Sequence, residues 1–553
     1  MPLVERRIGI LFAAFLLCLT LAGLRVCYLG LVKGSGLSNY ATSQQVAVTK
    51  LPALRGTITD RKGVPLASSV PADDVSATPY LIKDPVAVAN RIAPLLNVPA
   101  DKLVGELARR DTGFVYLARR VPAQATDRLR AMKIDGLDFA PGALRTYPRG
   151  VLAAQVLGAV GVDGNGLFGL EYAHDKALRG RDGVQRRVMD GSRQAIETRD
   201  TKKAIAGGAM ALTIDAEIQQ RTEDVLQGVG DEYNPKGATA IVTNPKTGAV
   251  LAMANWPKVD ANKPGSAPAA AIQNRAVGMT YEPGSTFKAF TVAAALEDKK
   301  VTPTTSFNLA PTIQIADRVI NESHDRGWVT LDTAGILAQS SNVGAITIGQ
   351  RLGAKSFSQW VDRFGFGQRT GVDLPGEERG LITPLADYSG ASMGNMPMGQ
   401  GELVTPMQMM GAYGAIANGG LLTKPHVVNS VDGKPTTSGG STRVISAETA
   451  ASVRRMLTGV FEAGGTASEV TIPGYQLAGK TGTSNKIDPT TGKYSESQYV
   501  ASFVGMAPAE NPELLVSVIV DEPQGDIYGG SVAAPAFGKI AAFALPYLRI
   551  SPK

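Results

Sequence analysis

Residues 281–290, YEPGSTFKAF, contain a serine and a lysine in the pattern S-x-x-K. A proline and a glycine interrupt the chain, and the alanine-rich stretch from Ser285 to Lys300 then predicts a helix. That helix would carry Ser285 at its start and Lys288 one turn later on the same face. A neutral lysine amine can take the proton of a serine hydroxyl, and the helix dipole favours the negative charge that develops. Alone, the pattern is also compatible with a helix cap and a surface lysine.

A second polar segment interrupts LDTAGILAQSSNVGAITIGQRLG at Ser340-Ser341-Asn342. The flanking pattern predicts two helices with a break between them. A serine hydroxyl at the break can relay a proton, and the asparagine amide can bind a peptide group. The simpler interpretation, an N-cap of the second helix, is compatible with both.

The segment GYQLAGKTGT, residues 474–483, allows two interpretations. It matches the phosphate-binding loop G-x-x-x-x-G-K-[ST], but that loop precedes a long helix. Here QLAG predicts a strand and TGTSNKIDPTTGKY is rich in turn residues, which argues against a nucleotide site. On a sheet edge, Lys480 would instead offer positive charge to a carboxylate. Gly482 would leave room for a substrate backbone, and a neighbouring N–H could serve an oxyanion hole.

The triplet Lys-Thr-Gly occurs a second time, at residues 246–248. ATAIVTNPKTGAVLAMAN predicts two alternating strands joined at this triplet, with Asn244 and Pro245 supplying the turn. We therefore interpret Lys246 as a surface turn residue.

The sequence around these segments predicts an α+β domain over residues 206–553. MALTID predicts a strand, EIQQRTEDVLQGV an amphipathic helix, VASFVGMAP and LLVSVIVDEP two more strands, and AAPAFGKIAAFALPYL a closing helix. With the hairpin and a mainly helical middle, they form an antiparallel sheet flanked by helices. Residues 33–205, a patchwork of short apolar segments, are expected to form an extended non-catalytic domain.

The N-terminus predicts a membrane anchor over residues 8–32. Roughly 25 residues of helix extend about 37 Å, enough to span the hydrocarbon core. The flank after Leu24 lacks the small residues of a cleavage site, which favours an uncleaved anchor over a signal peptide. Arg6 and Arg7 place residues 1–7 in the cytoplasm, so the remaining chain would lie outside the membrane. Arg25 would reach the headgroups or contact a partner membrane helix.

Composition excludes several classes of protein. The net charge of +7 is a mild bias, which suits anionic lipid or cell-wall polymer but forms no nucleic-acid patch. The three histidines are far apart, and both cysteines, Cys18 and Cys27, fall in the anchor. No metal site and no disulfide in the main body are expected.

The order S-x-x-K, S-x-N and K-T-G resembles that of the penicillin-recognising serine acyl-transferases. Ser341 replaces the aspartate of S-D-N, a position that takes no chemical part in the family. Four further stretches resemble class B penicillin-binding proteins, the monofunctional transpeptidases of cell-wall synthesis: RGTITDRKGVPLA (55–67), RTYPRGVLAAQVLGAVG (145–161), GLFGLEYAHDKALRGRDG (166–183) and MGQGELVTPMQMMGAYGAIANGG (398–420). GFGQRTGVDLPGE (365–377) and the compact motif spacing resemble the division type, with the elongation type as the alternative.

This resemblance implies a peptidoglycan stem peptide ending in D-Ala-D-Ala as substrate, without a metal, nucleotide or other cofactor. It implies four catalytic residues, Ser285, Lys288, Ser340 and Lys480, and four substrate-binding residues, Asn342, Thr481, Gly482 and Thr483. Lys288 would activate Ser285, the backbone N–H groups of Ser285 and Thr483 would hold the oxyanion, and Ser340 would pass a proton to the leaving D-alanine. Asn342 would orient the donor peptide, whose carboxylate would meet Lys480, Thr481 and Thr483.

The resemblance also implies partners. β-Lactams would acylate Ser285, and a SEDS-type membrane glycosyltransferase and division proteins would contact the anchor and residues 33–205. A membrane-anchored β-lactamase, a β-lactam sensor and a pure division scaffold are the alternatives. Within residues 33–205, Arg55, Asp60 and Arg61 are expected to form a structural ion-pair junction.

Overall fold

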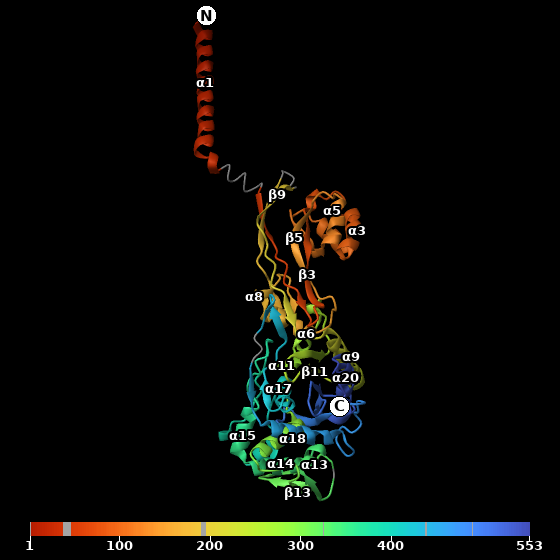
Figure 1. The fold of residues 1–553 in the computed structure, drawn as a ribbon. Coiled ribbons are helices and arrows are strands. Elements are labelled where there is room, and N and C mark those ends of the chain that lie inside the picture. Colours follow the sequence, from red (N-terminus) through yellow and green to blue (C-terminus); the bar gives the residue numbers. More distant parts are fainter. Residues whose placement is uncertain are drawn as a thin grey trace. The chain divides into compact units, whose positions relative to one another are not determined.

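The computed structural model describes residues 2–36, 46–189, 195–324, 326–436, 440–488 and 490–552 (Figure 1). Its internal contacts divide the chain into two compact units. The first consists of Met1–Leu54, Val70–Leu144 and Gly180–Ala206, and the second of Arg55–Ser69, Arg145–Arg179 and Gly207–Lys553. The second unit therefore includes two short segments from the N-terminal third of the sequence.

The N-terminal apolar stretch forms helix α1 (Pro2–Cys27), which continues as the π-helical turn η1 (Tyr28–Val32). Within the described residues, Val4–Val32 is the one helix that is long and apolar enough to cross a membrane. Its side chains from Val4 on are almost all exposed and predominantly apolar. The predicted N-terminal apolar helix is confirmed.

The first unit contains a small sheet and a helical lobe. Strands β1 (Val46–Leu51), β8 (Gly183–Met189) and β9 (Ala195–Lys202) pair antiparallel in the order β1-β8-β9. Helices α3 (Pro85–Leu96), α4 (Ala100–Leu107) and α5 (Ala123–Ala131) form one buried cluster with β4 (Val115–Pro122). Asp84 caps α3 by accepting from the Ala87 N–H at 3.0 Å, and a left-handed Asn97 ends that helix.

A five-stranded antiparallel sheet is the centre of the second unit. Its order is β12 (Val250–Trp256), β11 (Gly237–Thr243), β23 (Leu514–Asp521), β22 (Tyr494–Ala507) and β21 (Ala478–Ile487). The strands alternate between two buried clusters: Ile241 faces one, whereas Ala240 and Val242 face the other. This alternation has the period of two that the pleat imposes, so both faces of the sheet need a helical cover.

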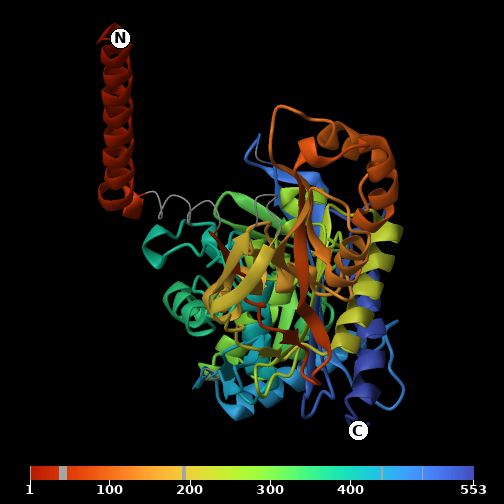
Figure 2. The same cartoon turned by 90° about the horizontal axis from the view of Figure 1, so that it is seen from above.

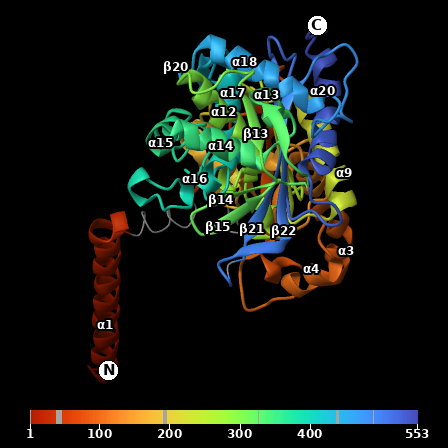
Figure 3. The same ribbon diagram turned by 90° about the horizontal axis from the view of Figure 1, so that it is seen from below.

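Helices α9 (Ala216–Tyr233) and α20 (Ala534–Tyr547) cover one face and lie side by side (Figure 2). The opposite face carries α12 (Lys288–Glu297), α14 (Asn342–Leu352), α17 (Pro406–Ala417) and α18 (Ala447–Thr458) (Figure 3). Each of α9, α14, α17 and α18 begins at a polar N-cap residue that accepts a backbone hydrogen bond.

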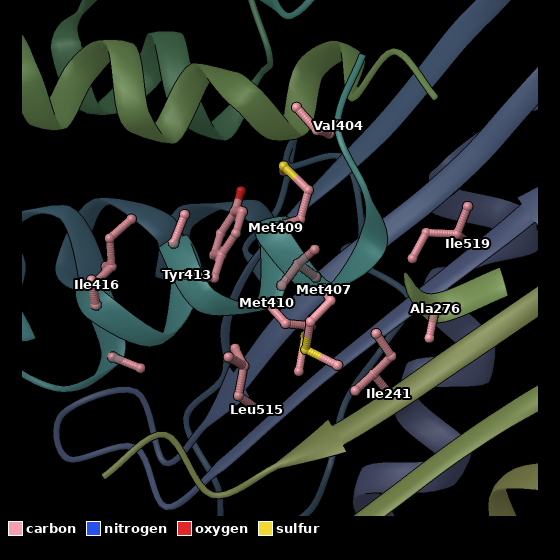
Figure 4. Close-up of a cluster of buried hydrophobic side chains, with 14 of the residues drawn as sticks. Ile241, Ala276, Val404, Met407, Met409, Met410, Tyr413, Ile416, Leu515 and Ile519 are labelled. Carbon is pink, nitrogen blue, oxygen red and sulfur yellow. The ribbon is translucent and has the colours of Figure 1, made fainter. Parts of the chain in front are cut away.

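Helix α17 links the sheet to the segment of the predicted nucleophile. Met407 and Met410 point toward Ile241 and the strand that carries Leu515 (Figure 4). Tyr413 extends from α17 on another side, and its hydroxyl donates to the Thr286 carbonyl at 2.7 Å. The sheet core and the residue next to Ser285 are therefore joined through one helix.

The α+β architecture predicted from the sequence is confirmed, with two local differences. Ser285 lies in a single 3₁₀ turn, η4 (Gly284–Phe287), and α12 begins only at Lys288. Strand β21 begins at Ala478 and continues to Ile487, so the first part of the turn-residue-rich segment after Lys480 is a strand. Pairing with the long strand β22 satisfies its backbone, which outweighs the turn preference of its glycine, serine and asparagine.

The predicted ion-pair junction is confirmed for Arg55 only. Arg55 pairs with Glu171 and Asp175 inside the second unit. The Asp60 carboxylate instead accepts hydrogen bonds from the backbone N–H groups of Lys62, Val64 and Ala216, at 2.8, 2.8 and 3.1 Å. Arg61 forms no ion pair with any described residue, and its backbone N–H donates to the Ile214 carbonyl at 2.9 Å.

Candidate active site

The eight predicted site residues come together in the second unit. One pocket of about 880 Å³ is lined by six of them, Ser285, Ser340, Asn342, Thr481, Gly482 and Thr483. The two lysines, Lys288 and Lys480, have 0% exposure and lie beneath that lining. The serine, asparagine and threonine groups thus face the ligand space, whereas both amines are inside the protein.

Two glycines, Gly284 and Gly399, allow the backbone before Ser285 to pack closely against a neighbouring segment. Gly284 has a left-handed φ of 54°, and its N–H donates to the Gly399 carbonyl at 2.9 Å. A Cβ at Gly399 would lie 2.1 Å from the Gly284 carbonyl oxygen, so only glycine permits this approach. Ser285, the next residue, is half-buried and lines the pocket.

The Lys288 amine is anchored to the second motif. It donates to the Ser340 carbonyl at 2.6 Å, to the Ser340 hydroxyl at 3.3 Å and to Asn342 Oδ1 at 2.7 Å. Burial lowers the pKa of Lys288 to about 7, although the charge of Glu322 opposes that shift. Near neutral pH the amine therefore populates the neutral form that a general base requires.

The expected hydrogen bond between Ser285 and Lys288 is not present among the described residues; the amine is engaged by Ser340 and Asn342 instead. Catalytic hydrogen bonds are commonly long in a ligand-free enzyme and tighten when substrate binds. Ser340, which hydrogen-bonds the Lys288 amine, lines the same pocket as Ser285.

The turn between α13 (Thr333–Ala338) and α14 has an unusual backbone. Ser340 adopts a left-handed conformation with φ of 59°, which is rare for a residue other than glycine and is concentrated at functional sites. Ser341, rather than Ser340 or Asn342, is the N-cap, and its hydroxyl accepts from the Gly344 N–H at 2.9 Å. The predicted helix break and its N-cap are thus both present, and the cap leaves Ser340 and Asn342 available to the pocket.

Lys480 lies on the edge strand β21, which has a partner strand on one side only. Its amine donates to the Thr481 carbonyl at 3.1 Å and forms no ion pair with any described residue. Burial and the nearby charge of Lys288 lower the pKa of Lys480 well below 10.5. The free protein therefore disfavours the positive charge that the sequence predicted, and an incoming anion would restore it.

The remaining residues of this strand complete the wall. A Cβ at Gly482 would lie 2.4 Å from the Ser502 hydroxyl and 3.0 Å from the Pro283 carbonyl, so glycine lets β21 pack against the nucleophile segment. The Thr481 hydroxyl is 2.7 Å from that of Thr466, and the Thr483 hydroxyl accepts from the Gly529 N–H at 3.1 Å.

The second Lys-Thr-Gly triplet is a surface turn, as predicted. The Asn244 side chain accepts from the backbone N–H groups of Lys246 and Thr247, and Gly248 has a left-handed φ of 75°. The exposed Lys246 amine lies 3.6 Å from Glu513.

Sequence reasoning missed several groups around the pocket. Glu322, whose side chain is 4% exposed, contacts the Ser341–Asn342 turn, but no motif marks it. Behind the nucleophile, Glu282 accepts from the Gly401 N–H at 2.9 Å and from the Tyr494 hydroxyl at 3.2 Å. Burial raises the pKa of Glu282, and that of Glu402 is raised further by burial and by Glu282. Only Glu282 had a sequence clue, its place three residues before Ser285.

No cluster of three or more His, Cys, Asp or Glu among the described residues could hold a metal.

Two family models match the chain. Residues 238–542 match the penicillin-binding protein transpeptidase domain, and residues 50–212 match the penicillin-binding protein dimerisation domain. The first match contains all eight predicted site residues.

Relatives and solved structures extend over nearly the whole chain. Stage V sporulation protein D of Bacillus subtilis is 33% identical over 96% of this chain and 84% of its own length. Peptidoglycan D,D-transpeptidase FtsI of Escherichia coli is 32% identical over 99% of this chain and 92% of its own.

Penicillin-binding protein 3 of Mycobacterium tuberculosis, solved with aztreonam, superposes with a TM-score of 0.72 at 30% identity, covering 91% of this chain and 98% of that one. Together with the two domain matches and the serine–lysine pocket, these likenesses show that the chain belongs to the class B penicillin-binding proteins, a family of serine acyl-transferases.

Proposed function

We propose that this protein is a septal peptidoglycan D,D-transpeptidase that cross-links stem peptides through an acyl-enzyme on Ser285. The observation that carries the proposal is one pocket lined by Ser285, Ser340 and residues 481–483. The buried amines of Lys288 and Lys480 lie beneath it, and the pKa of Lys288 is lowered. Relatives in Neisseria are named probable peptidoglycan D,D-transpeptidases, which supports the same reaction here.

Acylation begins when Ser285 Oγ attacks the carbonyl of the penultimate D-alanine. Lys288, partly neutral near pH 7, takes the hydroxyl proton as the new C–O bond forms. The backbone N–H groups of Ser285 and Thr483 hold the oxyanion, each contributing ~3 kcal/mol by analogy with other acyl-transfer sites. The C–N bond then breaks, and Ser340, which hydrogen-bonds Lys288, passes the proton to the leaving D-alanine.

Cross-linking completes the cycle with the reverse proton movement. The amine of a second stem peptide attacks the Ser285 ester and gives up one proton through Ser340 and Lys288. The ester C–O bond breaks, Ser285 Oγ regains a proton, and a new peptide bond remains between the two strands. No step consumes a metal or a cofactor.

Substrate binding uses the two walls of the pocket. Asn342 orients the donor peptide through its amide, and Gly482 lets the peptide backbone approach β21. The terminal carboxylate of the donor meets Thr481, Thr483 and the Lys480 amine. Because burial lowers the pKa of Lys480, binding this carboxylate would draw a proton onto the amine.

The proposed arrangement at the membrane follows the sequence. Residues 1–7 form a cytoplasmic tail, 8–32 a single-pass anchor, 33–205 a non-catalytic domain and 206–553 an extracytoplasmic transpeptidase domain. A SEDS-type membrane glycosyltransferase would supply glycan strands, and division proteins would contact the anchor and residues 33–205. The similarity to FtsI supports the septal role over the elongation type.

The nucleophile is tested by labelling with a fluorescent penicillin, which offers a strained amide in place of the donor. Ser285→Ala should abolish covalent labelling, because no other residue supplies the attacking oxygen. Ser468→Ala is the matched control, since Ser468 is an exposed serine on the same pocket and should label normally. A mass measurement should place the adduct on the peptide with Ser285. Labelling that survives in Ser285→Ala would reject the assignment.

Two further measurements separate the alternatives. The full chain in detergent should keep its penicillin adduct for hours, whereas release within seconds would indicate a β-lactamase. A fluorescent fusion should gather at division sites; an even distribution along the growing side wall would favour the elongation type.

A further inference from the structure

Glu322 occupies a position that the reaction outlined above does not explain. It follows β15 (Arg318–Asn321), which forms a hairpin with β14 (Thr312–Ile315) next to α14 (Figure 3). Its side chain is only 4% exposed, although glutamate is rarely buried without a specific partner. The role of this carboxylate is therefore decided by what it contacts.

The Glu322 carboxylate contacts the second motif at three points. One oxygen accepts from the Ser341 hydroxyl at 2.6 Å and from the Val343 N–H at 3.3 Å. The other oxygen accepts from the Asn342 N–H at 2.7 Å. Two of these donors are N–H groups in the first turn of α14, which have no carbonyl partner within the helix and where the helix dipole stabilises negative charge. The residue before them is the left-handed Ser340.

The same turn carries the acceptors of the Lys288 amine. The Ser340 carbonyl and Asn342 Oδ1 accept from that amine at 2.6 and 2.7 Å, and the Asn342 amide also donates to the Asn321 carbonyl at 3.0 Å. Asn342 is thus fixed from both sides, by the base and by the strand that leads into Glu322. If Glu322 released the turn, the strained Ser340 could relax and move its carbonyl away from the amine.

We propose that Glu322 is a positioning residue for acylation, which holds the Ser340–Asn342 turn against the Lys288 amine while Arg326 balances its charge. Arg326 forms an ion pair with Glu322 and also donates to Gln339 at 3.4 Å. The inference rests on the proposed function, because it concerns the basicity of Lys288 in the acylation step.

Electrostatics give this pair a measurable signature. Burial has the largest effect on the pKa of Lys288 and lowers it; the negative charge of Glu322 opposes this lowering, whereas the positive charge of Arg326 adds to it. The Lys480 amine also lies close to Lys288, whose charge lowers the pKa of Lys480. Removing Glu322 or Arg326 should consequently move the titration of Lys288 in opposite directions, which a purely structural role would not do.

The test measures the second-order rate constant of acylation by a fluorescent penicillin between about pH 5 and pH 9, with the full chain in detergent. Glu322→Gln should shift the acid limb, the fall of the rate constant at low pH, to lower pH by about half a unit or more, because it removes a negative charge near Lys288. It should also lower the constant rate at high pH, because it removes an acceptor that holds the turn. Arg326→Gln should shift the limb to higher pH by a similar amount. The double variant should return the limb toward that of the wild type.

Glu297→Gln is the matched control. The Glu297 carboxylate also holds a helix start, accepting from the N–H and hydroxyl of Ser446, the N-cap of α18, at 3.1 and 2.8 Å. Unlike Glu322, it takes no part in the pKa shift of Lys288. Its variant should retain the wild-type acid limb and plateau.

Opposite shifts in the two single variants would support the inference. Shifts in the same direction, or a wild-type limb that neither variant moves, would overturn it and leave the proposed function standing. A wild-type protein that is not acylated at any pH would overturn the proposed function and this inference with it. If Glu322→Gln fails to fold, Arg326→Gln still decides, because an unmoved limb in that variant contradicts the charge balance.

Discussion

The two Lys-Thr-Gly triplets of this chain have the same letters and opposite environments. At residues 246–248 the triplet forms the bend between β11 and β12, where the Asn244 side chain caps the turn and Lys246 is 41% exposed. At residues 480–482 it lies within the edge strand β21, where Lys480 has 0% exposure. One lysine has a carboxylate partner, Glu513, and the other has none among the described residues.

This difference shows that the environment, rather than the motif, sets the chemistry of the amine. An exposed lysine beside a carboxylate keeps its charge, and the ion pair contributes little because water screens it. A buried lysine without an acid partner resists protonation until an anion arrives. Lys480 can therefore gain its proton when a substrate carboxylate binds, whereas Lys246 has no such change in charge to couple to binding.

The largest difference between the two triplets is expected when each lysine is replaced separately by alanine. Lys480→Ala should lower the acylation rate by about 100-fold or more, since it removes the cation that would meet the substrate carboxylate in a desolvated site. Lys246→Ala should acylate like the wild type. The rate constant of labelling by a fluorescent penicillin measures both. Equal losses in the two variants, or no loss in Lys480→Ala, would contradict the distinction.

A second effect should appear in the pH dependence. Lys288 must be neutral to accept the Ser285 proton, and burial lowers its pKa to about 7. The acylation rate should thus be constant above pH 7 and fall about tenfold per unit below it, as the protonated fraction grows. The profile of Lys246→Ala should superimpose on that of the wild type. A wild-type rate that does not change between pH 5 and 8 would exclude Lys288 as the base.

Much of this site was predictable because its signals are local. Alternation of apolar residues predicted β11 and β12, and Asn244 with Pro245 predicted the turn between them. The break at Ser340–Asn342 was predictable because polar residues interrupt two helical patterns. The order of the three motifs then indicated which serine and lysines belong together.

The unpredicted features depend on contacts between segments far apart in the chain. Glu322 contacts Asn342 only because the β14–β15 hairpin folds back next to α14, and the sequence near Glu322 contains no motif. The lowered pKa of Lys480 depends on complete burial beside Lys288, which the strand pattern does not specify. Likewise β21 continues to Ile487, through residues that favour turns, because β22 pairs with it and not because of its own propensity.

Replacing the glycine of each triplet by alanine should affect different properties: the acylation rate for Gly482 and the stability for Gly248. Gly482→Ala would place a Cβ against Ser502 and Pro283, displacing the segment of Ser285, so the acylation rate should fall roughly tenfold. Gly248→Ala would force a side chain into a left-handed turn and against the Lys424 carbonyl, at 2.3 Å, which should cost about 1–2 kcal/mol of stability. Thermal unfolding and labelling of the folded fraction separate the two results. A Gly248→Ala protein that is folded but slow to acylate would contradict this assignment.

The smallest effect should come from the threonines. Thr481→Val removes a hydroxyl that lies 2.7 Å from that of Thr466 and would meet the substrate carboxylate, so acylation should slow by about two- to tenfold, the value of one hydrogen bond. Thr247→Val removes only an exposed hydroxyl that accepts from the Ala249 N–H at 3.2 Å, where water can replace it. Its acylation rate should equal that of the wild type. If the two variants acylate equally, Thr481 takes no part in binding, and the functional part of the triplet at residues 480–482 is reduced to Lys480 and Gly482.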